Sequence, residues 1–141
     1  MQRVQFKAYG HENVIGDHKT TVELTSEDHL TRQGTCIIGV RASITLNQLD
    51  ASIKELATSS NIKILLRMSV DGLTEEIVGT GSPGLTYTDS TSMVARTSNF
   101  ECGRTLMVNA NKAASDLDRK FVDSLKKEGV SIECELVYIT Q

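Results

Sequence analysis

Hydrophobic and polar residues alternate along several short segments of this chain, which is the pattern of β-strands with one buried face. The clearest case is Ile62–Val70, which is followed by Asp71-Gly72 and by a second segment of the same kind, Leu73–Thr80. Asp-Gly between two such segments favours a two-residue hairpin turn, because both turn positions need a positive φ. The pattern therefore predicts a β-hairpin over residues 62–80.

Further strands and two helices are predicted around this hairpin. Apolar residues at helical spacing predict one helix over Leu46–Thr58, after a capping-box pattern, and a second over Lys112–Glu128, with Asn111 as its N-cap. The other alternating segments predict strands over residues 3–8, 20–25, 36–42, 85–88, 92–97, 105–109 and 130–136.

Strands thus outnumber helices, and most are short, so the sheets are expected to be mostly antiparallel with one solvent-facing side each. The order of elements shows neither a βαβ rhythm nor an internal repeat. A chain of 141 residues can form one domain with a substantial core. We predict a single domain, residues 1–141, that is mainly β: an antiparallel, jelly-roll-like β-sandwich with two α-helices. An α+β layered fold is the alternative.

Charge and cysteine content narrow the classes of function. The net charge is −3, so broad nucleic-acid binding is not expected, although a local basic site is compatible with it. Three cysteines without a C-x-x-C pattern indicate reduced thiols in a cytoplasmic protein rather than a disulfide framework. Neither an apolar leader nor an apolar run of membrane-spanning length is found, so we expect no signal peptide and no membrane span.

The most promising segment for chemistry is the polar stretch 96–118, where basic residues gather before the second predicted helix. A helix start offers free backbone N–H groups, and arginine offers a bidentate fork, to a phosphate or carboxylate. The alternative is that the arginines form ion pairs with Glu23, Glu101 or Asp116 across strands. The predicted site for a small anionic ligand consists of Arg96, Ser98, Arg104, Asn111 and Lys112, with Asn109 beside it.

A second hypothesis is a divalent metal site in the loop before the second strand. His11, Asp17 and His18 could bind Zn²⁺ or a similar ion, with His29 and Glu23 as further candidates. Their spacing matches no established ligand motif, and the alternative is that each histidine hydrogen-bonds its own turn. Cofactor use is otherwise unknown from the sequence.

Cys102 is the third candidate, because the nearby Arg104 would favour its thiolate. A small buried residue is the simpler interpretation of this cysteine, and for Cys36 and Cys134 alternation predicts inward-facing side chains. The charged residues of the second helix are of both signs, which indicates a solvated face. The sequence contains none of the phosphate-loop, dinucleotide-loop, nucleophile-elbow or H-E-x-x-H motifs.

Three blocks together resemble a known family: GHENVIGDHKTTVELT, LTRQGTCIIGV and RTSNFECGRTLMVNANKAASDLDR. They are similar to an archaeal family described only as a domain of unknown function, DUF371, and they occur in that family's order over nearly the whole chain. The resemblance implies a single, mainly β domain of jelly-roll type and no established activity. The family usually has Asp where this chain has Thr35 and Asn99, so a carboxylate role at these positions is in question here.

The sequence supports three hypotheses of function. The leading one is a cytoplasmic protein that binds a small anionic ligand at the basic corner. The second is a metal-dependent hydrolase or nuclease acting on a phosphodiester, and the third is an interaction subunit of a larger assembly. The sequence does not decide whether the protein is an enzyme, and a monomer and a homodimer are both compatible with it.

Overall fold

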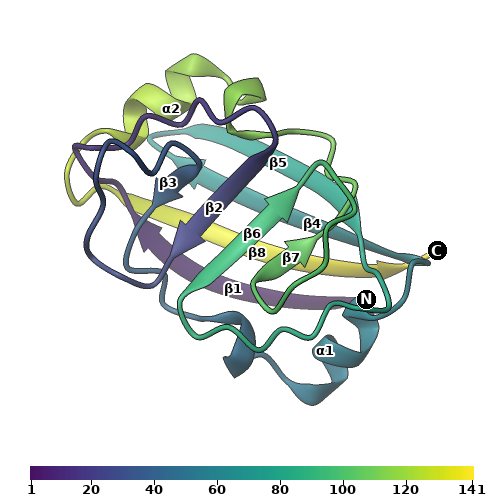
Figure 1. Ribbon diagram of the computed structural model, residues 1–141. Coiled ribbons are helices and arrows are strands. Elements are labelled where there is room, and N and C mark those ends of the chain that lie inside the picture. The colour runs from purple at the N-terminus through teal and green to yellow at the C-terminus, as the bar shows by residue number, and fades with distance from the viewer.

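Two four-stranded β-sheets pack face to face in the computed structural model, which describes all residues from 1 to 141 (Figure 1). The first sheet is antiparallel throughout and has the order β1 (Gln2–Tyr9), β8 (Ser131–Thr140), β4 (Ile62–Val70) and β5 (Leu73–Thr80). The second sheet has the order β3 (Ile37–Gly39), β2 (Thr21–Thr25), β6 (Ser92–Arg96) and β7 (Thr105–Met107). The predicted mainly β sandwich with two helices is confirmed.

The hairpin prediction is confirmed residue by residue. β4 ends at Val70 and β5 begins at Leu73. Asp71 and Gly72 between them have φ angles of 49° and 78°. The predicted strand at 85–88 is wrong, because Tyr87 adopts a φ of 51° that breaks the extended backbone. A further departure from an antiparallel sandwich is that β3 and β7 pair in parallel with β2 and β6.

Both helices are shorter than predicted. α1 (Ala51–Ala57) and α2 (Arg119–Leu125) are each preceded by one separate turn of 3-10 helix, at Leu46–Gln48 and Ala114–Asp116. The break comes from Leu49 and Leu117, each buried and with extended backbone (ψ 150° and 148°). The two helices lie at opposite open sides of the sandwich (Figure 1).

The cap of the second helix was also predicted wrongly. Asp118 occupies this position, and its carboxylate accepts a hydrogen bond from the Lys120 backbone N–H at 2.7 Å. Asn111 instead accepts a hydrogen bond from the Val78 backbone N–H at 2.9 Å, which ties this part of the chain to β5. The basic corner therefore does not stand at the start of a long helix.

The chain contains an internal repeat, contrary to the prediction from its pattern. The two halves, residues 2–70 and 73–140, have the same order of elements: three strands, a 3-10 turn, an α-helix and a long strand. Isolated bridges recur at matching positions, Tyr9 with Val40 and Thr80 with Val108. Arg41 directly follows Val40, Asn109 directly follows Val108, and both have a φ of 53°.

Sequence similarity between the halves is too slight to reveal this repeat. Its clearest traces are Val-x-Ala after the third strand of each half and Leu-Asp before each α-helix, at Leu49-Asp50 and Leu117-Asp118. The register between the halves also changes, because the connection 26–36 is three residues longer than the connection 97–104. A comparison of the two halves at one constant spacing therefore fails beyond this connection.

The two halves interlock around a pseudo-two-fold axis. β1 of the first half pairs with β8 of the second, and β5 of the second pairs with β4 of the first. In the middle of each sheet the equivalent strands meet as antiparallel neighbours, β4 with β8 and β2 with β6. Arg67 and Glu135 are equivalent residues of the two halves and pair directly with each other, as do Glu23 and Val94 in the other sheet. The axis therefore passes between the members of each pair. One hydrophobic cluster of 36 residues fills the space between the sheets.

Candidate functional site

The candidate site lies on the outer face of the second sheet, where β2 and β6 meet. Thr21 is the cross-strand partner of Arg96, and Glu23 is the partner of Val94. Directly paired residues point to the same side of a sheet, so these four side chains share one face. The residues between them on each strand, such as the buried Val22, point into the core.

Arg96 is held in a fixed position on this face. Its Nε donates a hydrogen bond to Thr105 Oγ1 at 2.8 Å, and its Nη2 donates to Cys102 Sγ at 3.4 Å. The guanidinium carbon lies 4.9 Å from the centre of the Phe100 ring, a cation–π contact with a side chain that is 57% exposed. Arg96 therefore leans towards β7 without a carboxylate partner.

The Cys102 thiol shares this environment. Burial raises its pKa, but hydrogen bonds from the Thr105 hydroxyl, the Arg104 backbone N–H and Arg96 outweigh burial and leave the pKa below its usual value. The sulfur lies 3.4 Å from Thr105 Oγ1. Donors that stabilise a thiolate also suit a bound anion, and the hydrogen bonds around the Cys102 sulfur are of this kind.

Arg104 is exposed and, like Arg96, forms no ion pair. The ion pairing with Glu101 or Asp116 that the sequence left open is not formed. Glu101 instead accepts hydrogen bonds from the Ser82 hydroxyl and from the Gly84 backbone N–H, the latter at 2.8 Å. Asp116 accepts a hydrogen bond from the Ala113 backbone N–H at 2.9 Å.

Of the other predicted anion ligands, Ser98 belongs to the same connection, where its hydroxyl accepts a hydrogen bond from the Phe100 backbone N–H at 3.3 Å. Lys112 lies against the first sheet, with its Nζ 2.6 Å from Glu75 Oε1. Since Asn111 is bonded to β5 as well, the structure divides the predicted set. Arg96, Ser98 and Arg104 lie at the end of β6 and in the connection to β7, whereas the charge of Lys112 is neutralised by Glu75.

Glu23 is the residue of this face that the prediction of the anion site missed. Its side chain is nearly buried, with the residue only 9% exposed, and its hydrogen-bond partner is the Cys36 thiol at 3.5 Å. Burial and the charge of Glu23 raise the pKa of Cys36 to about 11. Cys36 is half-buried rather than fully inward-facing as predicted, while Cys134 is buried.

The predicted metal ligands do not form a cluster. His11 Nδ1 accepts a hydrogen bond from the Asn13 backbone N–H at 3.0 Å, and His18 Nδ1 accepts from the backbone N–H groups of Thr20 and Thr21 at 3.2 Å each. Each histidine thus hydrogen-bonds its own turn, which was the alternative interpretation. The structure arranges no group of three or more His, Cys, Asp or Glu side chains, Asp17 included, to hold a metal ion.

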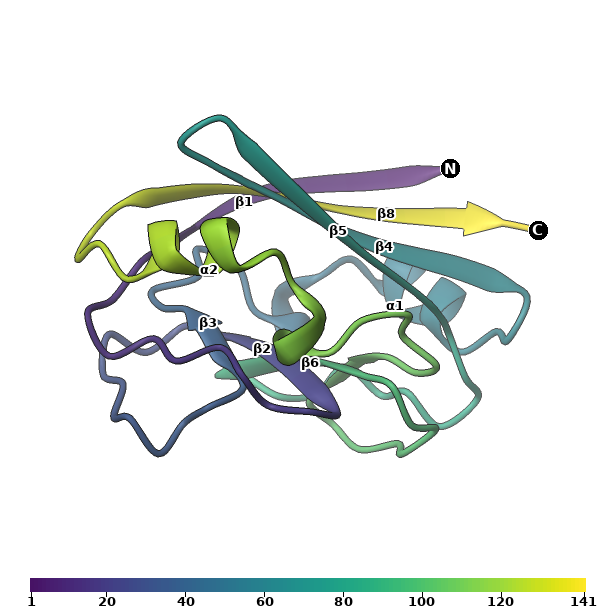
Figure 2. The same cartoon turned by 90° about the horizontal axis from the view of Figure 1, so that it is seen from above.

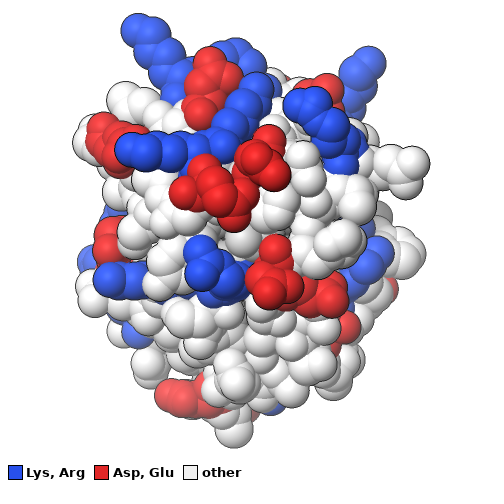
Figure 3. All heavy atoms as spheres, turned by 90° about the vertical axis from the view of Figure 1, so that its left-hand side faces the viewer, with Lys and Arg blue, Asp and Glu red and all other residues white.

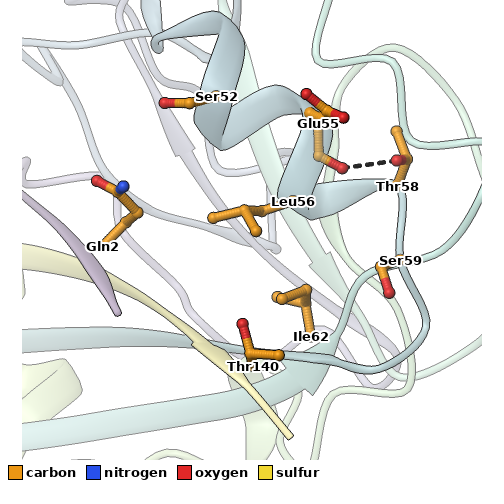
Figure 4. Close-up of a pocket in the computed structure, with 8 residues that line it drawn as sticks. All are labelled: Gln2, Ser52, Glu55, Leu56, Thr58, Ser59, Ile62 and Thr140. Carbon is orange, nitrogen blue, oxygen red and sulfur yellow. Dashed lines mark hydrogen bonds between the residues drawn. The ribbon is translucent and has the colours of Figure 1, made fainter.

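Hollows in the surface lie away from this face. The largest, about 580 Å³, opens between α1 and the ends of β4 and β8 (Figure 4). Leu56 and Ile62 line it together with hydroxyl groups, and Glu55 contributes its one charge. The complete lining is Gln2, Ser52, Glu55, Leu56, Thr58, Ser59, Ile62 and Thr140.

Charges of both signs are mixed on the side of the molecule at the left of Figure 1, where Lys and Arg stand among Asp and Glu (Figure 3). An ion pair in α2 and just after it joins Lys126 and Asp123 at 3.3 Å. A surface of mixed sign concentrates anions less than a surface of one sign. No helix is long and apolar enough to cross a membrane.

Comparison with known proteins gives a family but no activity. The model of the family described as "Domain of unknown function (DUF371)" matches residues 6–139. An uncharacterized protein of Methanocaldococcus jannaschii is 44% identical over 121 residues, which cover 86% of this chain and 89% of that protein.

Proposed function

The chain belongs to the DUF371 family, and we propose that it binds a small ligand bearing a phosphate or carboxylate group through Arg96 and Arg104. The observation that carries the proposal is the fixed but unpaired guanidinium of Arg96. Thr105, Cys102 and Phe100 orient it, and no carboxylate of the chain neutralises it. Arg104, in the connection that leads to Thr105, adds a second unpaired positive charge.

The chemistry of arginine supports this choice of ligand. Its planar fork matches the oxygens of a phosphate or carboxylate, and such charge-assisted hydrogen bonds contribute about 1.5–3 kcal/mol each. Orientation by neighbours reduces the side-chain entropy lost on binding. A cytoplasmic protein, monomeric or dimeric, fits these properties, and its three free thiols support that location.

A metal-dependent hydrolase or nuclease would need ligands beside the same arginines. His11 and His18 are engaged in their own turns, so no observation favours this second function over simple binding. The exposed Phe100 would suit an interaction subunit, but it already stacks under Arg96 and so serves the anion site equally.

The experiment is a titration of the ¹⁵N-labelled protein with propyl phosphate, followed by NMR. We expect amide shifts over residues 96–105, and Arg96→Gln should weaken binding by about 10- to 100-fold, as expected for losing a charge-assisted bond. Arg3→Gln, which removes an exposed arginine of the first sheet, is the matched control and should bind normally. Equal weakening by both variants, or no shift over 96–105, would refute the proposal.

A further inference from the structure

We propose that the ligand of this site is zwitterionic, with its anionic group on Arg96 and a primary ammonium group on Glu23. The inference rests on the proposed anion site and adds the chemistry of the other end of the ligand. It starts from an unusual feature of Glu23, a nearly buried carboxylate that no cation of the chain neutralises.

Buried carboxylates are almost always paired with a cation or with strong hydrogen-bond donors. Glu75, 8% exposed, follows this rule, because Lys112 Nζ and the Asp118 backbone N–H each lie 2.6 Å from its carboxylate oxygens. Glu23 is as deeply buried, yet its one partner is the Cys36 thiol, a weak donor at 3.5 Å. No buried side-chain oxygen of the structure lacks a partner, so solvent reaches the second carboxylate oxygen of Glu23. A bound ammonium group would replace solvent there and neutralise the charge.

The position of Glu23 relative to Arg96 fits a single small ligand. Arg96 is two residues along β6 from Val94, the direct partner of Glu23, so the two charged residues are diagonal neighbours on one face. The Cα atoms of such neighbours are about 7–8 Å apart. They form no ion pair with each other, because Arg96 leans towards Thr105 of β7 and Glu23 bonds to Cys36 on the opposite side.

The internal repeat strengthens this argument. Glu23 and Cys36 of the first half correspond to Val94 and Arg104 of the second, and Thr25 corresponds to Arg96. The backbone of this face is therefore nearly symmetric, but its charge is negative on one side and positive on the other. The connections 26–36 and 97–104 project beyond the sheet at its two ends (Figure 2). Such a face suits one ligand with two unlike ends.

An ammonium group is the cation that these residues fit. A metal ion would need at least three protein ligands here, and the structure brings only Glu23 and the Cys36 thiol together. An ammonium group needs just one carboxylate and neighbouring polar atoms, which Thr21 offers beside Glu23 on the same face. The ligand class is thus a small aminoalkyl phosphate or an amino acid.

Phosphoethanolamine and propyl phosphate test the proposal, because they have the same heavy-atom skeleton and only the first carries an ammonium group. Binding of each is measured by calorimetry and NMR. The intact protein should bind phosphoethanolamine about tenfold more tightly, as expected for one charge-assisted contact. Glu23→Gln should reduce this ratio to about one without changing propyl phosphate binding. Glu27→Gln, which alters an exposed glutamate next to β2, should keep the ratio.

The outcomes separate the two proposals. If propyl phosphate fails to bind the intact protein, the anion site is wrong and this inference falls with it. If propyl phosphate binds at Arg96 but phosphoethanolamine binds no better, only the ammonium subsite is wrong. A ratio that survives in Glu23→Gln would likewise overturn the role of Glu23. Unchanged propyl phosphate binding also shows that the variant is folded.

Discussion

The Tyr87→Phe substitution removes one hydroxyl from the centre of the sandwich. Tyr87 is fully buried, and its hydroxyl donates a hydrogen bond to the Leu106 backbone oxygen at 2.7 Å. The hydroxyl oxygen of Tyr87 also lies 2.9 Å from the hydroxyl oxygen of Tyr138, which is buried as well. Since the Tyr87 proton points to Leu106, Tyr138 donates to Tyr87, and the three groups form a chain. Burial raises the pKa of both tyrosines, so they stay neutral.

The magnitude follows from what each variant leaves unpaired. In Tyr87→Phe, the Leu106 oxygen loses its donor and the Tyr138 hydroxyl its acceptor, so we expect a loss of about 2–3 kcal/mol in the free energy of unfolding. In Tyr138→Phe, the bond from Tyr87 to Leu106 survives, and the expected loss is about 1 kcal/mol. The double variant should be about as stable as Tyr87→Phe alone, because the two losses share one hydrogen bond.

Urea unfolding followed by circular dichroism measures these losses from the shift of the midpoint at constant slope. Tyr9→Phe is the control: Tyr9 lies half-buried at the surface, with Arg41 4.3 Å over its ring, and keeps that contact as Phe. A loss that is larger in Tyr138→Phe than in Tyr87→Phe would refute the direction of the chain. Strictly additive losses in the double variant would refute the shared bond.

Two further predictions concern the thiols and the repeat. Alkylation followed by mass spectrometry should modify Cys102 at a lower pH than Cys36, because the pKa of Cys102 is lowered and that of Cys36 is raised to about 11. Arg96→Gln should raise the pH at which half of Cys102 is modified. If this pH does not change, the contact of Cys102 with Arg96 is contradicted. Gly10→Ala and Gly81→Ala should each destabilise the protein by about 2 kcal/mol or more in urea unfolding. At each glycine an added Cβ would overlap backbone carbonyl oxygens at the end of a helix, in equivalent places of the two halves, and a tolerated substitution at either would contradict this packing.

Local patterns were sufficient for the hairpin, because alternation and Asp-Gly act within a few residues of each other. Helix lengths were not predictable in the same way. The apolar spacing continues through Leu49 and Leu117, but the backbone there is extended so that both side chains reach the core. Tertiary packing overrides the local helical preference at these two leucines.

The site was only half predictable for the same reason. Arg96 and Arg104 were predicted together because they are close in sequence and basic. Lys112 was assigned to them although Glu75, 37 residues away, neutralises it. Glu23 was considered only as an ion-pair partner of the arginines. Its place beside Arg96 without such a pair depends on the register of two strands about 70 residues apart in sequence, which follows from the interlocked repeat.

The most direct test of the site is a crystal structure of the protein with phosphoethanolamine. We expect the phosphate within hydrogen-bonding distance of the Arg96 guanidinium and the ammonium group at the Glu23 carboxylate. A ligand bound in the hollow beside α1, or a phosphate held by the lysines near α2 with the outer face of the second sheet empty, would contradict it.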